Sequence, residues 1–112
     1  MSESFEFGLK PEVTAAIRSV LAKFPCISEA ILYGSRAKGN YQPGSDIDLT
    51  LTTSSEPPSS LLLELEVALD NLDLPYSFDL SLLGRIDNDN LREHIERVGV
   101  LFYSSRQINT CR

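Results

Sequence analysis

The stretch from residue 34 to residue 49 constrains this chain more than any other, because it joins a Gly-Ser turn to two closely spaced aspartates. An apolar run leads into the turn, and a loop rich in Gly and Pro separates the turn from Asp46 and Asp48. Side chains two residues apart in a β-strand point to the same face. The spacing therefore predicts that both aspartates project from one face, with Ile47 and Leu49 turned to the other.

These residue types indicate a particular chemistry. Two neighbouring carboxylates repel each other, and a divalent cation relieves that repulsion. Gly34 and Ser35 can offer backbone N–H groups and a hydroxyl to a phosphate, while Arg36 and Lys38 add positive charge nearby. Phosphate donors next to acidic metal ligands point to phosphoryl or nucleotidyl transfer.

Composition favours a single soluble domain. The chain has 112 residues, of which 42% are hydrophobic and 23% charged. No apolar run approaches the roughly 20 residues of a membrane span, and the acidic N-terminus does not resemble a signal peptide, so we expect a cytoplasmic protein. Two cysteines, Cys26 and Cys111, and one histidine do not suggest a zinc site.

The net charge of −6 limits the partners. A protein that follows a nucleic-acid backbone needs a basic face, and Lys and Arg form no cluster here. An extended nucleic-acid interface is therefore not expected, whereas a small nucleotide accompanied by magnesium is compatible with this charge.

Hydrophobic periodicity and turn residues predict the order of elements. The elements expected are a helix over about 11–24, a strand over 27–33, a short helical turn from an N-cap at Ser35 to Lys38, a strand over 46–52, a leucine-rich helix over about 61–72, a strand over 76–83 and a last helix after the cap at 87–90. Residues 100–103 form an apolar run of undetermined type. Residues 1–10 are expected to be an extended lead-in, 11–103 one domain and 104–112 a flexible tail.

The order α-β-turn-β-α-β-α predicts an α/β (α+β) fold with one small mixed sheet and helices mainly on one face. Asp79 is the acid within the third predicted strand, where it alternates with Phe78 and Leu80. A strand–helix–strand return can bring it beside Asp46 and Asp48, which predicts three carboxylates on the polar face.

Gly-Ser, then Arg-Ala-x-Gly, then Ser-Asp-x-Asp-Leu, running from Gly34 to Leu49, resembles the motif of the DNA polymerase β-like nucleotidyltransferase superfamily. The chain looks most like the minimal bacterial and archaeal nucleotidyltransferases that are often encoded beside a helical HEPN-type partner. The resemblance extends more loosely from about residue 11 to residue 103.

That resemblance implies a mechanism. Asp46 and Asp48 would bind two Mg²⁺ ions, or Mn²⁺ as a substitute, and Asp79 would contact one of them. An NMP, expected to be AMP from ATP, would pass to an acceptor hydroxyl while pyrophosphate leaves. The resemblance also implies four nucleotide- and phosphate-binding residues: Gly34, Ser35, Arg36 and Ser45.

The resemblance also implies a protein partner, because larger members of the superfamily carry further domains for the base and the acceptor. The expected partner is a HEPN-type or substrate-binding protein, and in related pairs the nucleotidyltransferase is the antitoxin. We expect the leucine-rich helix and the run 100–103 to form the contact surface. Oligomeric state is left open.

Several alternatives accompany these predictions. Asp-x-Asp, Gly-Ser, Arg36 and Lys38 each also occur as ordinary turn or surface residues. His94 is expected to be a packing or partner-surface residue, and Arg85, Arg92 and Arg97 surface charges. A phosphate loop of the G-x-x-x-x-G-K-[ST] type is excluded, because Asn40 follows the second glycine. A non-catalytic antitoxin that masks its partner stays open, and an antibiotic-modifying enzyme is less favoured for want of an acceptor-binding domain.

Overall fold

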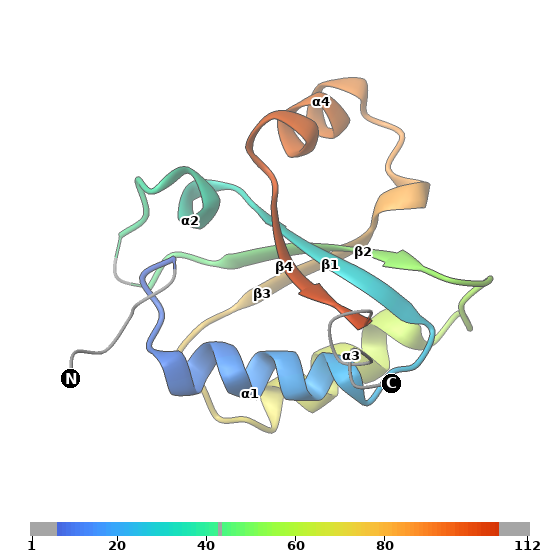
Figure 1. Ribbon diagram of the computed structural model, residues 1–112, viewed down its shortest axis with the longest axis horizontal. Helices are drawn as coiled ribbons and strands as arrows, with labels where there is room; N and C mark the ends of the chain where they lie inside the picture. Colours follow the sequence, from blue (N-terminus) through green and yellow to red (C-terminus); the bar gives the residue numbers. More distant parts are fainter. Residues whose placement is uncertain (1–6, 43, 106–112) are drawn as a thin grey trace.

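The structure is a computed structural model that describes residues 7–42 and 44–105 (Figure 1). Its elements follow in chain order: α1 (Pro11–Ala22), β1 (Ile27–Tyr33), α2 (Ser35–Lys38), β2 (Ile47–Thr53), α3 (Leu61–Asp70), β3 (Phe78–Leu82), a 3₁₀ turn η1 (Leu83–Arg85), α4 (Asp89–Val98) and β4 (Val100–Ser104).

One mixed sheet organises these elements, with strand order β3-β2-β1-β4. β1 lies antiparallel to both β2 and β4, whereas β2 and β3 run parallel. Parallel neighbours need a crossover, and α3 provides it between β2 and β3. The predicted mixed sheet is therefore confirmed.

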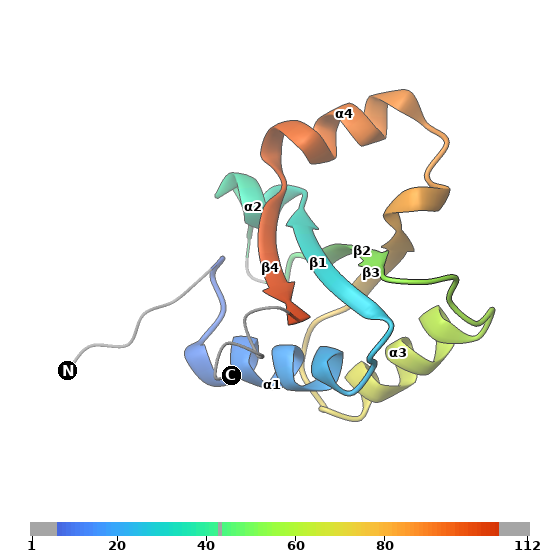
Figure 2. The same cartoon turned by 45° about the vertical axis from the view of Figure 1, so that its right-hand side comes forward.

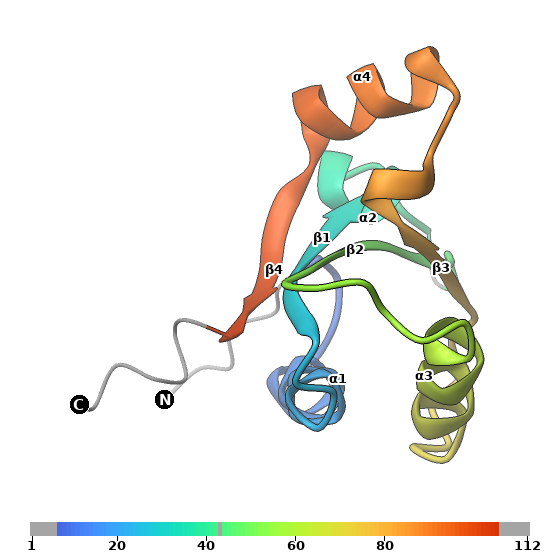
Figure 3. The same ribbon diagram turned by 90° about the vertical axis from the view of Figure 1, so that its right-hand side faces the viewer.

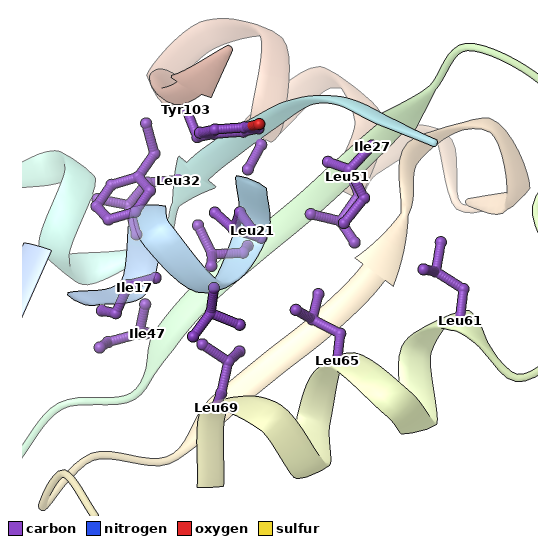
Figure 4. Packing of buried hydrophobic residues seen from close by; sticks show 14 of the residues in the cluster. Ile17, Leu21, Ile27, Leu32, Ile47, Leu51, Leu61, Leu65, Leu69 and Tyr103 are labelled. Atoms are coloured by element: carbon purple, nitrogen blue, oxygen red, sulfur yellow. The ribbon is translucent and has the colours of Figure 1, made fainter. Parts of the chain in front are cut away.

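The core lies between one face of the sheet and the helices α1 and α3 (Figure 4). Alternate residues of β1 and β2, such as Leu32, Ile47 and Leu51, are buried there against Leu21 of α1 and Leu65 of α3. A leucine taken fully out of water contributes roughly 1.5–3 kcal/mol, so this layer supplies most of the stability of the fold.

The opposite face of the sheet is polar, and α4 lies over part of it, on the other side from α1 and α3 (Figure 3). The helix begins where Asn88 accepts a hydrogen bond from the Leu91 amide at 3.1 Å. It buries Ile95 against the sheet, and Gly99 ends it close to Ile31 of β1. Two of the three long helices thus share one face, as predicted.

The strand predictions need one main correction. The run 100–103, of undetermined type in the sequence, is the edge strand β4 paired with β1. Its Phe102 and Tyr103 are buried in the core, so only Val100 and Leu101 remain exposed. The prediction that this whole run forms a partner surface is therefore wrong for its second half. β4 also includes Ser104, which the sequence reading placed in the tail.

Smaller corrections concern boundaries. α1 and α3 each end about two residues before the predicted limit. β3 is shorter than 76–83, because Tyr76 and Ser77 belong to the irregular segment before it and Leu83 begins η1. β2 begins one residue later than predicted. The N-cap of α2 is Gly34 rather than Ser35, which is its first helical residue.

The segment before α1 also joins the core. Leu9 is completely buried, and the carbonyl of Phe7 accepts a hydrogen bond of 2.7 Å from Arg36. Residues 1–6 and 106–112, which contain most of the predicted lead-in and tail and also Cys111, lie outside the described residues. Among the helices of the described part, none is long and apolar enough to cross a membrane.

Candidate active site

The candidate active site lies on the polar face of the sheet, where β2 and β3 run side by side. Asp48 of β2 is directly opposite Asp79 of β3 in the parallel register. Asp46 comes two residues before Asp48, just outside the start of β2. Asp48 is half-buried, whereas Asp46 and Asp79 are exposed. The structure therefore brings together the three acids that the sequence predicted.

The electrostatics of Asp48 reflect this crowding. Burial raises the pKa of its carboxyl from 3.8 to about 6, and the negative charges of Asp79 and Asp46 act in the same direction. A nearby cation would stabilise the charged form of a carboxylate in this environment. The cause is physical and local: three acids are held close together with part of their water removed.

The Gly-Ser turn reaches the same point from β1. Gly34 has φ +79°, and a Cβ added there would overlap Oδ2 of Asp48. Only glycine allows both this backbone conformation and this close approach. Gly34 and Asp48, which have 13 residues between them in the sequence, are therefore in direct contact.

α2 starts at this turn and is closed by Gly39, whose φ of +89° lies in the left-handed region. The amide of Lys38 bonds to the carbonyl of Gly34 at 3.1 Å. Within such a short helix the earlier amides, from Ser35 onward, have no intrahelical acceptor and can bind an anion. This places potential phosphate donors beside the acids, as the sequence predicted. Lys38 is exposed at the end of α2.

Arg36 and Ser45 lie differently from the prediction of direct phosphate contacts. Arg36 is only 3% exposed, and its guanidinium donates to the carbonyls of Ser45 (3.1 Å) and Phe7 (2.7 Å). It also lies over the rings of Tyr41 and Tyr76, at 5.3 and 5.0 Å from their centres. These contacts favour a structural role, in which Arg36 connects the segment before α1, the loop before β2 and the segment before β3.

Ser45 closes the loop that leads into Asp46. Its hydroxyl accepts a hydrogen bond from the amide of Gln42 at 2.8 Å, and its own amide donates to the carbonyl of Gln42 at 2.9 Å. This turn fixes where the chain enters β2. Ser45 therefore positions the aspartates through the backbone in this structure.

Sequence reasoning missed a group of hydroxyls beside the acids. Tyr33 pairs across the sheet with Asp48. Burial raises the pKa of its phenol, a hydrogen bond with Ser81 lowers it, and the charges of Asp79 and Asp48 raise it again. Ser81 in turn donates to Thr50 at 2.9 Å. Strand alternation could have found Tyr33, because it places Tyr33 on the face opposite to Leu32.

His94 of α4 packs edge-on against the Tyr33 ring, with 6.3 Å between ring centres. The predicted packing role of His94 is thus confirmed. Because Tyr33 lies beside Asp48 in the sheet, the contact also places α4 at the border of the site.

As the side chains stand, the described residues contain no group of three Asp, Glu, His or Cys arranged to hold a metal ion. The site presents a close pair, Asp48 and Asp79, with Asp46 near enough to raise the Asp48 pKa. Because Asp46 and Asp79 are exposed, their side chains are free of packing that would fix them. The donor set has the oxygen chemistry that Mg²⁺ prefers, without being a preformed cage.

Comparison with known proteins decides the family. The model of the family described as "Polymerase beta, Nucleotidyltransferase" matches residues 15–108. The chain belongs to this family. The match includes the Gly-Ser turn and all three aspartates, in agreement with the resemblance of the motif. No curated protein matches the chain closely enough to count as a relative.

Solved structures share the fold. A toxin–antitoxin complex with AMP-PNP matches with TM-score 0.67 and 23% identity, covering 85% of this chain and 76% of the other. A tri-AMPylated Shewanella oneidensis HEPN toxin in complex with MNT antitoxin matches with TM-score 0.62 and 20% identity over 88% and 75%. The toxin–antitoxin MntA-HepT gives 0.61 and 20% over 88% and 75%. The similarity therefore covers most of the fold of this chain and about three quarters of each of the other chains.

Proposed function

We propose that this chain is a Mg²⁺-dependent nucleotidyltransferase that moves AMP from ATP to a hydroxyl acceptor and acts with a HEPN-type partner as an antitoxin. The observation that carries the proposal is the contact between Gly34 and the Asp48 carboxylate, with Asp79 across the strand. It joins a phosphate-binding turn to an acid pair, and a nucleotidyltransferase needs both within the span of one triphosphate.

The acids suit a divalent cation. The pKa of Asp48 is raised by burial and by two neighbouring carboxylates, so a cation at this point offsets both desolvation and repulsion. Asp46, Asp48 and Asp79 would hold the metal, with Mn²⁺ as a substitute. When bound, two Mg²⁺ ions neutralise the phosphate charge and activate the acceptor hydroxyl.

The chain's own residues supply the remaining functions. The amides at the start of α2 bind phosphate oxygens and help the pyrophosphate to leave once the acceptor oxygen has bonded to the α-phosphorus. Asp79 is exposed at the sheet edge and can take the proton that the acceptor hydroxyl loses. Tyr33, buried beside Asp48 in the sheet, packs against His94 of α4 at the border of the proposed site.

The proposed nucleotide and partner draw on the similar structures. One of them contains AMP-PNP, and another contains an AMPylated HEPN toxin with its MNT antitoxin. We infer from these complexes that a partner protein completes the acceptor side of the site.

Transfer of a radiolabel tests the proposal. The chain is incubated with ATP labelled at the α-phosphorus, MgCl₂ and a HEPN-type protein encoded beside it. We expect label on the partner, loss of at least about 10²-fold in rate for Asp48→Asn, and little change for Asp87→Asn, an exposed acid away from the site. EDTA should abolish transfer.

The same experiment addresses the masking alternative. If the Asp48→Asn variant neutralises the partner as well as the wild type does, and no label moves in either case, the chain acts as a mask and the catalytic proposal is wrong. If label moves with the wild type alone, the acids are catalytic.

A further inference from the structure

α3 buries one side against the sheet and exposes two large apolar side chains on the other. Leu63 is 64% exposed and Val67 52% exposed, although Leu61, Leu65 and Leu69 of the same helix are buried. Residues four apart lie next to each other on a helix, so Leu63 and Val67 form one patch. Single exposed apolar residues need no explanation, but a continuous patch beside a cavity marks a contact surface.

The patch borders a cavity of about 440 Å³ between α3 and the segment 74–78, which we call the α3 groove. Its apolar walls come from Leu74, Tyr76 and Phe78 as well as from Leu63 and Val67. α3 and the segment that connects it to β3 form the groove, and β3 is an edge strand of the sheet; Figure 2 shows the course of the chain from α3 to β3. The groove ends at Phe78, whose side chain packs against the core on the α3 face, whereas Asp79, the next residue, belongs to the opposite face.

The two charged residues that line the groove are both acidic, while the buried Arg36, which lies over the ring of Tyr76, donates to backbone carbonyls. Glu66 and Asp70 line it, and the sequence contains no Lys, Arg or His between Lys38 and Arg85. Arg85, the basic residue that ends this stretch, forms an ion pair of 2.9 Å with Glu56, away from the groove-lining residues. An apolar centre with an acidic rim is complementary to an apolar side chain flanked by cations.

The same charge pattern disfavours a second copy of this chain. A two-fold contact places each patch against itself, so Glu66 and Asp70 of one copy would face Glu66 and Asp70 of the other. Like charges brought together at an interface oppose association. The occupant that fits is a different protein.

We propose that the α3 groove binds an amphipathic helix of a partner protein, whose leucine-type side chains insert between α3 and the segment 74–78 while flanking Lys or Arg residues contact Glu66 and Asp70. The exposed residues at i and i+4 suit helix-on-helix packing, in which an apolar face enters a groove. This surface is separate from the catalytic acids, so it does not depend on whether the chain transfers a nucleotide.

A peptide probe tests the proposal without nucleotide or metal, so that failure here leaves the transferase proposal untouched. The probe is a stapled helix with leucines four residues apart and lysines on both sides. Two matched probes replace its lysines by glutamates or its leucines by serines. Affinity is measured by fluorescence anisotropy, and the binding site is mapped by amide chemical shifts of the whole chain.

We expect the Leu/Lys probe to bind, to shift amides of α3 and residues 74–78, and to weaken with added salt. Leu63→Ser with Val67→Ser should weaken binding at least about tenfold, because the apolar anchors are lost while the acids remain. Glu66→Gln with Asp70→Asn should weaken it about fivefold and remove most of the salt dependence. Val100→Ser with Leu101→Ser, on the exposed part of β4, is the control and should change affinity less than twofold.

Four results would overturn the proposal. The first is equal binding of the Lys and Glu probes, and the second is a set of shifts that maps away from the groove. The third is an affinity unchanged by the α3 variants. The fourth is a dimer in sedimentation that dissociates with Leu63→Ser and Val67→Ser, which would make a second copy the occupant. The amide spectra of the variants also report whether they fold, which their exposed positions lead us to expect.

Discussion

The two faces of the sheet differ more than any other two regions of this molecule. On the α1/α3 face, Leu49 is completely buried in the core, whereas its neighbour Asp48 on the other face is half-buried beside two more acids. Burial on the α1/α3 face stabilises the folded state, whereas the face with the acids destabilises it by holding like charges together. A site that opposes folding persists only if the opposite face stabilises the fold by more, which is how functional sites in small domains are supported.

The largest expected effect lies on the apolar face. Leu49→Ala removes a completely buried side chain from the middle of β2 and should lower the free energy of unfolding by about 2–5 kcal/mol. Urea denaturation measures this change. Leu63→Ala, at a position 64% exposed, is the matched control and should stay within about 0.5 kcal/mol of the wild type. A similar loss of stability in both variants would contradict the burial of Leu49 in the core.

The next effect lies where the backbone meets the polar face. Gly34→Ala puts a Cβ against the Asp48 carboxylate and forces alanine into a φ of +79°. The conformational strain alone should lower the free energy of unfolding by about 1–2 kcal/mol, and displacement of Asp48 should weaken nucleotide binding. Calorimetry with AMP-PNP and MgCl₂ measures the binding.

Gly84→Ala is the control for this substitution, since no atom lies within 4 Å of its added Cβ and its φ is not positive. It should change neither stability nor binding appreciably. If Gly34→Ala binds the nucleotide as well as Gly84→Ala does, the turn is not part of the binding site.

The contrast between the faces also explains what the sequence could predict. The turn and Asp46-x-Asp48 lie within one local stretch, strand alternation places Asp79 on the polar face of its own strand, and the strand–helix–strand return brings it beside Asp48. The same alternation separates Leu49 from Asp48 and predicts which face the helices cover. Local spacing thus predicted the core face and the pair Asp46 and Asp48, and the order of elements added Asp79.

Features that depend on distant contacts escaped prediction. The run 100–103 is too short for periodicity to distinguish a strand from a helix, and pairing with β1 decides the outcome. Arg36 follows the turn directly, but its guanidinium donates to the carbonyls of Phe7 and Ser45, contacts that the local sequence does not indicate. The role of Tyr33 depends on Ser81, 48 residues later. None of these partners is adjacent in the sequence.

A smaller effect tests the cost of the polar face directly. The pKa of Asp48 is about 6 in the folded chain and 3.8 in an ordinary carboxyl, so folding favours the protonated form. The unfolded state therefore binds fewer protons between these values, and stability falls as the pH rises from about 4 to about 6. Above pH 6 the whole penalty is present.

Asp48→Asn should remove that penalty. In the absence of metal we expect the variant to be more stable than the wild type by about 1 kcal/mol at pH 7.5, a value reduced for partial exposure to solvent, and equally stable near pH 4. Urea titrations at both pH values measure the difference. Asp87→Asn, at an exposed position, should show no such dependence on pH. A difference that is the same at both pH values would show that charge is not its cause.

The smallest effect is the reversal of this cost by a cation. Mg²⁺ at about five times its dissociation constant should stabilise the wild type by about 1 kcal/mol, because binding to the folded state alone shifts the equilibrium by mass action. The melting temperature should rise by several degrees for the wild type and for Asp87→Asn, and much less for Asp48→Asn and Asp79→Asn. An equal rise in Asp48→Asn would place the cation elsewhere. If Asp79→Asn retains the full rise in melting temperature and Asp48→Asn does not, the metal binds without Asp79, and β3 contributes no ligand.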